Sequence, residues 1–135
     1  MEYIICFKKL EELDLSSTSI INNGFRYISK LNKLKVLILN NTPLRDRDLN
    51  HITKLKNIET LIISDTSISN RGLKPLKHLK ELKYLNLDTT RITDNGLIYL
   101  RSLSNLRELY LKNTNVSKKG IKKLKGYLPN CKIIG

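Results

Sequence analysis

The stretch "LDTTRITDNGLIYL", residues 87–100, decides the fold, because it belongs to a pattern that returns every 24 residues. Numbering the positions of each copy from one, the copies begin at Leu10, Leu34, Ile58, Leu82 and Leu106. The fourth position is leucine in all five copies and the sixth is leucine or isoleucine. The ninth position is threonine throughout: Thr18, Thr42, Thr66, Thr90 and Thr114. Chance does not keep such a register, so residues 87–100 are part of a repeated scaffold.

Each copy changes its hydrophobic period halfway along. Apolar residues alternate from the first to the sixth position, which predicts a short strand with one buried face. They then fall three apart, as in Leu97, Leu100 and Leu103, which predicts a short helix. A hydroxyl that can cap this helix precedes it at Ser69, Thr93 and Ser117. Glycines that allow close approach at the bend follow at Gly24, Gly72, Gly96 and Gly120.

A unit of this size cannot bury its apolar edge alone, so the copies must stack on one another. Strands of successive copies then form one parallel sheet, and the helices lie behind it. Parallel crossovers are overwhelmingly right-handed. The sequence therefore predicts an α/β fold: a right-handed solenoid with a parallel sheet on its concave face and short helices on its convex face.

The pattern LxxLxLxxTxITDxGLxxLxxLxx resembles the leucine-rich repeat of the 24-residue class. It is similar to repeats of bacterial proteins and to the longer, cysteine-containing repeats of F-box substrate receptors. The resemblance covers nearly the whole chain and implies protein recognition, without naming a partner. No F-box-like helical segment accompanies it, so a role in ubiquitin ligation has no support. The family often carries Asn or Cys at the ninth position; here we expect threonine to hydrogen-bond the turn of the neighbouring copy.

We expect one domain over residues 1–135, with repeats from 10, 34, 58, 82 and 106. Residues 1–9 match the helical half of a repeat, because Ile4 and Phe7 fall where Ile28 and Leu31 lie one copy later. They form either a half-repeat or an N-terminal cap. An uncovered terminal repeat would expose apolar surface, so the oligomeric state is left open.

Residues 128–135 predict a C-terminal capping strand. Leu128, Cys131 and Ile133 fit the three apolar strand positions two residues early, which makes Cys131 a core residue. Cys6 stands near the other end, some five strand spacings of ~4.8 Å away. A disulfide needs Cα atoms within ~7 Å, so this fold excludes an intrachain bridge.

Composition is typical of a soluble globular chain, with 40% apolar and 27% charged residues. No apolar run is long enough to cross a bilayer, and the opening residues do not resemble a leader peptide. We therefore expect a cytoplasmic protein, or one that is exported without a conventional signal peptide.

Nothing in the sequence displays an active site, a metal site or a cofactor-binding site. His51 and His78 stand at different positions of different copies, with no ligand cluster nearby, so both are expected at the surface. The turn aspartates are expected to cap helices and stabilise turns: Asp46, Asp65, Asp88 and Asp94. We expect neither an enzyme nor a protein with a small-molecule substrate.

Binding is better supported, because the third and fifth strand positions point away from the core. The candidate partner-binding residues are Val36, Ile38, Thr60, Ile62, Tyr84, Asn86 and Tyr110. Their apolar and aromatic members would form an exposed patch, with Glu12 and Asp14 at one end and Lys112 at the other. Strand propensity alone is the competing explanation for Val, Ile and Tyr at these positions.

Positive charge suggests a second candidate surface. The net charge is +13, and residues 106–135 contribute more than half of it. The lysines of the last helix are Lys118, Lys119, Lys122, Lys123 and Lys125. They could dock on an anionic membrane or on nucleic-acid phosphates, although solubility alone also explains lysines on a solvated helix.

These observations predict a protein–protein interaction module that binds through its concave sheet surface. If the chain is a bacterial effector delivered into a host cell, its partner would be a host protein. The alternative is a basic adaptor that docks on an anionic surface through the last repeat.

Overall fold

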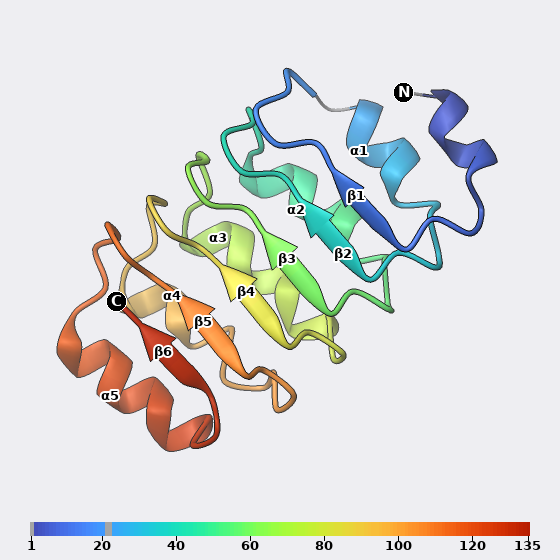
Figure 1. Ribbon diagram of the computed structural model, residues 1–135. Coiled ribbons are helices and arrows are strands. Elements are labelled where there is room, and N and C mark those ends of the chain that lie inside the picture. The colour runs from blue at the N-terminus through green and yellow to red at the C-terminus, as the bar shows by residue number, and fades with distance from the viewer. Residues whose placement is uncertain (1, 21–22) are drawn as a thin grey trace.

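A computed structural model describes residues 2–20 and 23–135 of the chain. Its strands, each three residues long, are β1 (Glu12–Asp14), β2 (Val36–Ile38), β3 (Thr60–Ile62), β4 (Tyr84–Asn86), β5 (Glu108–Tyr110) and β6 (Lys132–Ile134). They pair in chain order and all in parallel, so one open sheet runs the length of the molecule (Figure 1).

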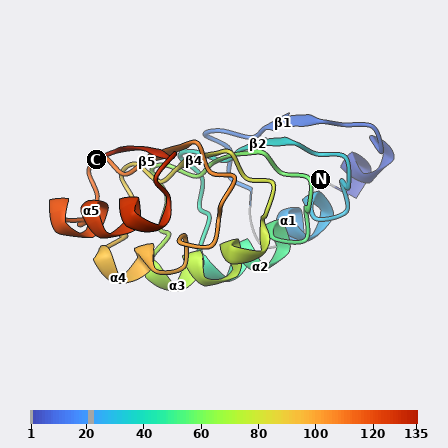
Figure 2. The same ribbon diagram turned by 90° about the horizontal axis from the view of Figure 1, so that it is seen from below.

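Short helices occupy the layer behind the sheet (Figure 2). The α-helices are α1 (Asn23–Ile28), α2 (Leu49–Ile52), α3 (Asn70–Leu73), α4 (Asp94–Leu97) and α5 (Lys118–Tyr127). The 3₁₀ helices are η1 (Glu2–Cys6), η2 (Asp46–Asp48) and η3 (Lys74–His78). The predicted right-handed α/β solenoid is confirmed. We call the side of the sheet that faces away from the helices the open face.

The core lies between the sheet and the helix layer. Fourth-position leucines of neighbouring copies stand directly opposite one another, for example Leu37 opposite Leu61, and both are fully buried. The predicted helix caps also form, since the side chains of Ser69, Thr93 and Ser117 accept backbone N–H groups of their helices. Each copy therefore adds one strand and one short helix to a continuous core.

The predicted register of the last strand is wrong. Ile133 stands opposite Leu109, so it occupies the fourth strand position and not the sixth, and β6 follows β5 at the ordinary 24-residue spacing. The reason is that α5 continues to Tyr127, and Leu128 packs at the end of this helix instead of starting the strand. Cys131 is fully buried, as predicted, but it lies just before β6.

The predicted role of the ninth-position threonine is also wrong. Its hydroxyl donates within its own copy, to the carbonyl oxygen of the sixth position: the distance from Thr42 to Leu39 is 2.6 Å, and Thr90 to Leu87 is the same. Neighbouring copies are joined one residue earlier, by the eighth-position backbone. Asn41 N–H, for example, donates to the carbonyl of Ser64 at 3.1 Å.

The eighth position carries a strain that the sequence pattern did not reveal. Its residues all have left-handed backbones, with φ between 53° and 55°: Ser17, Asn41, Asp65, Thr89 and Asn113. Left-handed residues other than glycine are uncommon. The threonine hydroxyl that closes the same turn helps to hold this conformation in every copy.

Replacing Thr90 by valine is expected to lower the free energy of unfolding by about 1 kcal/mol, because the side chain is buried and the Leu87 carbonyl loses its donor. Thr18→Val removes the same bond from an exposed turn, where water can replace the hydroxyl, so its cost should be smaller. Urea denaturation of both variants measures the difference. Equal losses in the free energy of unfolding would show that the contribution of this hydrogen bond does not depend on burial of the turn.

The two free cysteines lie near opposite ends of the chain. Cys6 is exposed and Cys131 is buried. Burial raises the pKa of the Cys131 thiol.

Within residues 2–20 and 23–135, no helix combines the length and the apolar character needed to span a membrane.

Candidate functional site

The open face consists of two rows of side chains that run across the strands. Strand residues alternate between the two faces, so the half-buried outer residues flank a fully buried central one in β2, β3, β4 and β5. The third-position row contains Val36, Thr60 and Tyr84 among the predicted residues. The fifth-position row contains Ile38, Ile62, Asn86 and Tyr110. The structure therefore brings all seven predicted partner-binding residues together on one continuous surface.

These side chains are more sheltered than the sequence predicted. All seven are half-buried, whereas the sequence pattern predicted an exposed patch. The reason is close spacing, since parallel strands lie ~4.8 Å apart and side chains of adjacent strands cover one another. The face is thus a packed, partly apolar surface.

Two tyrosines pack against each other on this surface. The rings of Tyr84 and Tyr110 lie with their centroids 5.1 Å apart and their planes tilted by 36°. The hydroxyl of Tyr110 donates to Oε2 of Glu108 at 2.7 Å. This hydrogen bond to Glu108 is the largest reason that the pKa of Tyr110 lies well above its ordinary value. The phenol stays protonated, and its ring is held in place by neighbours on both sides.

Strand β6 extends the open face with two residues that are not among the predicted partner-binding residues. Lys132 stands opposite Glu108, and Ile134 stands opposite Tyr110. Ile134 is half-buried and continues the apolar row, while Lys132 is exposed. They were missed because the expected register of this strand was two residues off; the regular 24-residue spacing was the signal that would have found them.

The ends of the open face carry opposite charges. Glu12 and Asp14 are exposed on β1, and hydrogen bonds from Ser16 lower the pKa of Asp14. Lys112 and Lys132 are exposed at the other end. The open face therefore has an apolar centre between an acidic end and a basic end.

The lysines of α5 form a separate surface, because the helix lies in the layer behind the sheet (Figure 2). Lys118, Lys119, Lys122 and Lys123 are exposed, and no ion pair among the described residues involves them. Lys125 differs, since its ammonium donates to the backbone carbonyl of Cys131. The fifth predicted lysine is therefore partly used to fix the chain between α5 and β6.

The two histidines, His51 and His78, are not part of any candidate catalytic or metal-binding cluster among the described residues. His78 is exposed, but His51 is half-buried and its Nδ1 is buried without a hydrogen-bond partner, which corrects its expected place at the surface. The described part of the chain holds no group of three His, Cys, Asp or Glu side chains that could bind a metal ion.

Two of the turn aspartates, Asp46 and Asp94, have structural roles, which were partly predicted. Asp94 accepts the backbone N–H of Ser117 at 2.7 Å and its hydroxyl at 2.6 Å. Asp46 binds Ser69 in the same way. Each of these carboxylates therefore orients the helix-capping serine of the next copy, which is a role between copies that the sequence did not specify. In both Asp46 and Asp94, each carboxylate oxygen accepts a hydrogen bond from the serine.

Comparison with known proteins agrees with the geometry. Residues 78–100 match the family model described as a leucine-rich repeat. An internalin from Listeria monocytogenes superposes with a TM-score of 0.84 at 17% identity, over 99% of this chain and 37% of that one. A leucine-rich repeat protein from Leptospira interrogans gives 0.64 at 22% identity, over 98% and 38%. Leiomodin-1 actin-binding site 2 gives 0.72 at 16% identity, over 96% and 85%.

The fold therefore defines a solenoid of short parallel strands and helices. The chain has the leucine-rich repeat fold, and it is similar to bacterial proteins of that fold. It spans less than two-fifths of the length of the internalin and the Leptospira protein described above. A search of curated protein sequences finds no match.

Proposed function

We propose that this protein is an interaction module that binds a partner protein through the open face of its sheet, without chemistry of its own. The observation that carries the proposal is the aromatic pair Tyr84–Tyr110, with Ile134 opposite Tyr110, at positions that the buried core does not use. Tyrosines are enriched among the residues that dominate binding energy. The leucine-rich repeat fold commonly serves protein recognition, which supports the same reading.

The size of the face fits a small partner. Six parallel strands span about 24 Å at ~4.8 Å per spacing. A standard interface covers ~800 Å² on each partner and would use most of this width. A loop, a peptide or one side of a small domain would cover the apolar rows, with its basic end over Glu12 and Asp14 and its acidic end over Lys112 and Lys132.

A bacterial effector that acts on a host protein is the more specific form of this proposal. The likeness to chains from Listeria monocytogenes and Leptospira interrogans motivates it. A host partner would be retained from mammalian lysate, and a bacterial partner from bacterial lysate, so parallel capture from the two lysates decides between them.

Replacing both Tyr84 and Tyr110 by alanine is expected to weaken capture of the partner by about 30-fold or more, because two central aromatic anchors are removed. The readout is affinity capture at physiological and at high salt, followed by titration of the captured protein against the purified variants. Thermal melts confirm that the variant remains folded. Tyr3→Ala serves as a matched control, because it makes the same change at an exposed tyrosine of η1, away from the strands of the open face.

The alternative, docking on an anionic surface through α5, predicts the opposite pattern. Its supporting observation is the set of four exposed lysines without ion pairs. Reversing the charge of Lys118, Lys119, Lys122 and Lys123 would then abolish retention, and high salt would do the same because exposed charge contacts are screened. The open-face proposal would be refuted if the partner were still captured by the double tyrosine variant and were no longer captured by the charge-reversed lysine variant.

A further inference from the structure

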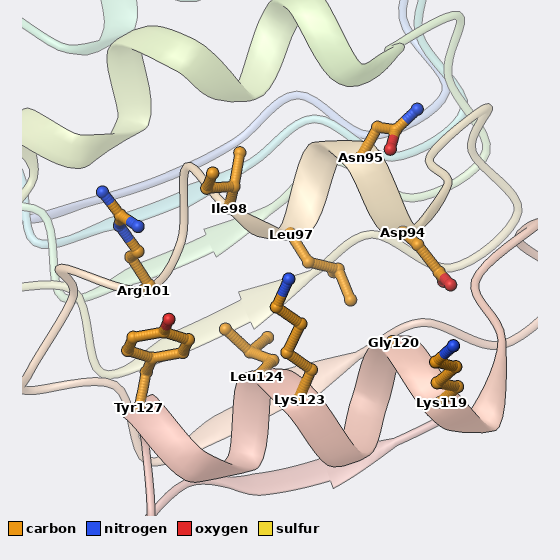
Figure 3. A pocket seen from close by; sticks show the side chains of 10 residues that line it. All are labelled: Asp94, Asn95, Leu97, Ile98, Arg101, Lys119, Gly120, Lys123, Leu124 and Tyr127. Atoms are coloured by element: carbon orange, nitrogen blue, oxygen red, sulfur yellow. The ribbon is translucent and has the colours of Figure 1, made fainter.

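We propose that the groove between α4 and α5 is a second binding site, which takes a peptide segment in which an acidic side chain stands next to a large apolar one. The groove has a volume of about 300 Å³, near the lower end for ligand sites. Figure 3 shows Ile98 and Arg101 on one side of it, with Lys119, Lys123 and Tyr127 on α5 opposite. It lies in the helix layer and shares no residue with the open face.

Ile98 is the first sign that this groove is more than a gap between repeats. It stands at the seventeenth position of its copy, where every other copy has a polar or charged residue: Arg26, Asn50, Lys74 and Lys122. Ile98 is 53% exposed. The scaffold therefore has no need of an apolar residue here, and exposing one costs solubility unless something covers it.

Tyr127 is the second sign. It stands at the twenty-second position, where the other copies bury a leucine: Leu31, Leu55, Leu79 and Leu103. In the last copy α5 remains helical through Tyr127, so the next residue, Leu128, takes the buried place. Tyr127 is thereby released from the core, 54% exposed, and lies beside the groove. Two large apolar side chains thus meet a floor made of the buried Leu97 and Leu124.

Three cations surround this apolar surface. The Arg101 guanidinium lies 5.9 Å from the centre of the Tyr127 ring, and Lys119 and Lys123 line the opposite side. Asp94 is the one acid in the lining, and both of its oxygens already accept hydrogen bonds from Ser117. Those bonds are the main reason that its pKa is lowered, with Lys119 contributing. The groove therefore keeps a surplus of positive charge for a carboxylate of the occupant.

A second groove of the helix layer shows what the scaffold gives without these features. It has a volume of about 440 Å³ and is lined by Asp46, Asn50, Arg71, Lys74, Pro75, Lys77 and His78. Proline is its one apolar side chain. The combination of exposed isoleucine, exposed tyrosine and cations belongs to the α4–α5 groove, so the recognised segment must carry an apolar and an acidic group together.

A peptide fits this groove better than a lipid bilayer does. The apolar residues lie between two helices with cations on both sides, whereas a membrane would meet the outer side of α5, where Lys118 and Lys122 lie. A pocket of this volume with half-exposed walls suits one or two side chains of a peptide, and not a buried acyl chain. Charge and shape thus favour an acidic, apolar peptide segment.

The test uses a random-peptide phage library selected on the full chain, followed by fluorescence polarisation with synthetic copies of the enriched peptides. We expect enrichment of Asp or Glu beside Leu, Phe or Tyr. Ile98→Asn should weaken these peptides about tenfold, because it restores the kind of residue that Asn50 provides in the second copy without adding charge. Arg101→Gln, or amidation of the peptide's acid, should weaken them about fivefold at low salt and less at high salt.

Tyr84→Ala is the control, because it alters the open face and should leave the affinity of these peptides unchanged. Peptides that keep their affinity for Ile98→Asn and lose it with Tyr84→Ala would assign the selection to the open face and overturn the groove proposal. Absence of any enriched acidic, apolar sequence would overturn it as well. So would equal binding of wild type and Ile98→Asn to phosphatidylserine vesicles with no peptide selected, since the cations would then serve a membrane.

Discussion

Replacing Gly96 by alanine is expected to lower the free energy of unfolding by about 2 kcal/mol, although the change adds only a methyl group. A Cβ at this position would lie 2.4 Å from Oδ1 of Asn70, the residue that reaches over from the preceding copy. That same oxygen accepts the backbone N–H of Thr93 at 2.9 Å, and the Asn70 amide donates to the Thr93 hydroxyl at 2.8 Å. Moving Asn70 aside would break both bonds and loosen the start of α4. Chemical denaturation measures the loss.

Gly126 provides the matched control for this prediction. It lies near the end of α5, and a Cβ there would meet nothing within 4 Å. Alanine favours helices over glycine, so Gly126→Ala should raise the free energy of unfolding by about 0.5 kcal/mol. If Gly96→Ala were as mild as Gly126→Ala, the contact between copies would not be what requires glycine at the bend.

For these glycines, the sequence predicted the close approach at the bend but not the atoms that make it. Their regular spacing predicted a close approach at the bend, and the structure confirms it at Gly72, Gly96 and Gly120. The atoms that approach them could not be predicted, because they come from a residue 26 positions earlier: Asn70 meets Gly96, and Asp94 meets Gly120. A repeat pattern fixes what recurs within a copy, whereas contacts between copies depend on how the copies stack.

The ninth-position threonines differ from the glycines, because a contact predicted between copies is found within each copy. A side chain that recurs in every copy was expected to join neighbours, yet its hydroxyl closes its own turn in all five copies. The joining bonds come from the backbone of the eighth residue, whose identity varies among Ser, Asn, Asp and Thr. Backbone hydrogen bonds leave little trace in a sequence because any residue except proline can donate them.

The candidate surfaces were predictable to different degrees. The two rows of the open face follow from strand alternation, so the sequence placed Tyr84 and Tyr110 correctly on strands and on the same face. The groove between α4 and α5 was not foreseen. It depends on Tyr127 leaving the core, and that follows from where α5 ends, which is a boundary that local periodicity predicts poorly.

Replacing Leu85 by alanine is expected to have the largest effect on stability, a loss of about 3 to 4 kcal/mol. Leu85 is fully buried on β4, with Leu61 and Leu109 directly opposite it on the neighbouring strands. The cavity would therefore open in the middle of the stack, where copies on both sides restrict collapse. Urea denaturation of the variant, with unchanged dependence on denaturant, would measure the loss directly.

Leu13→Ala makes the same chemical change at the end of the sheet and should cost about 1 to 2 kcal/mol. Leu13 is only partly buried, and β1 pairs on one side alone, with β2. In a solenoid each copy is stabilised mainly by its neighbours, so an end copy opens more easily than a central one. Amide exchange in the unmodified protein should then be faster in β1 than in β3 or β4. Equal costs for the two leucine variants, with uniform exchange along the sheet, would mean that the stack behaves as one cooperative unit whose ends are as secure as its centre.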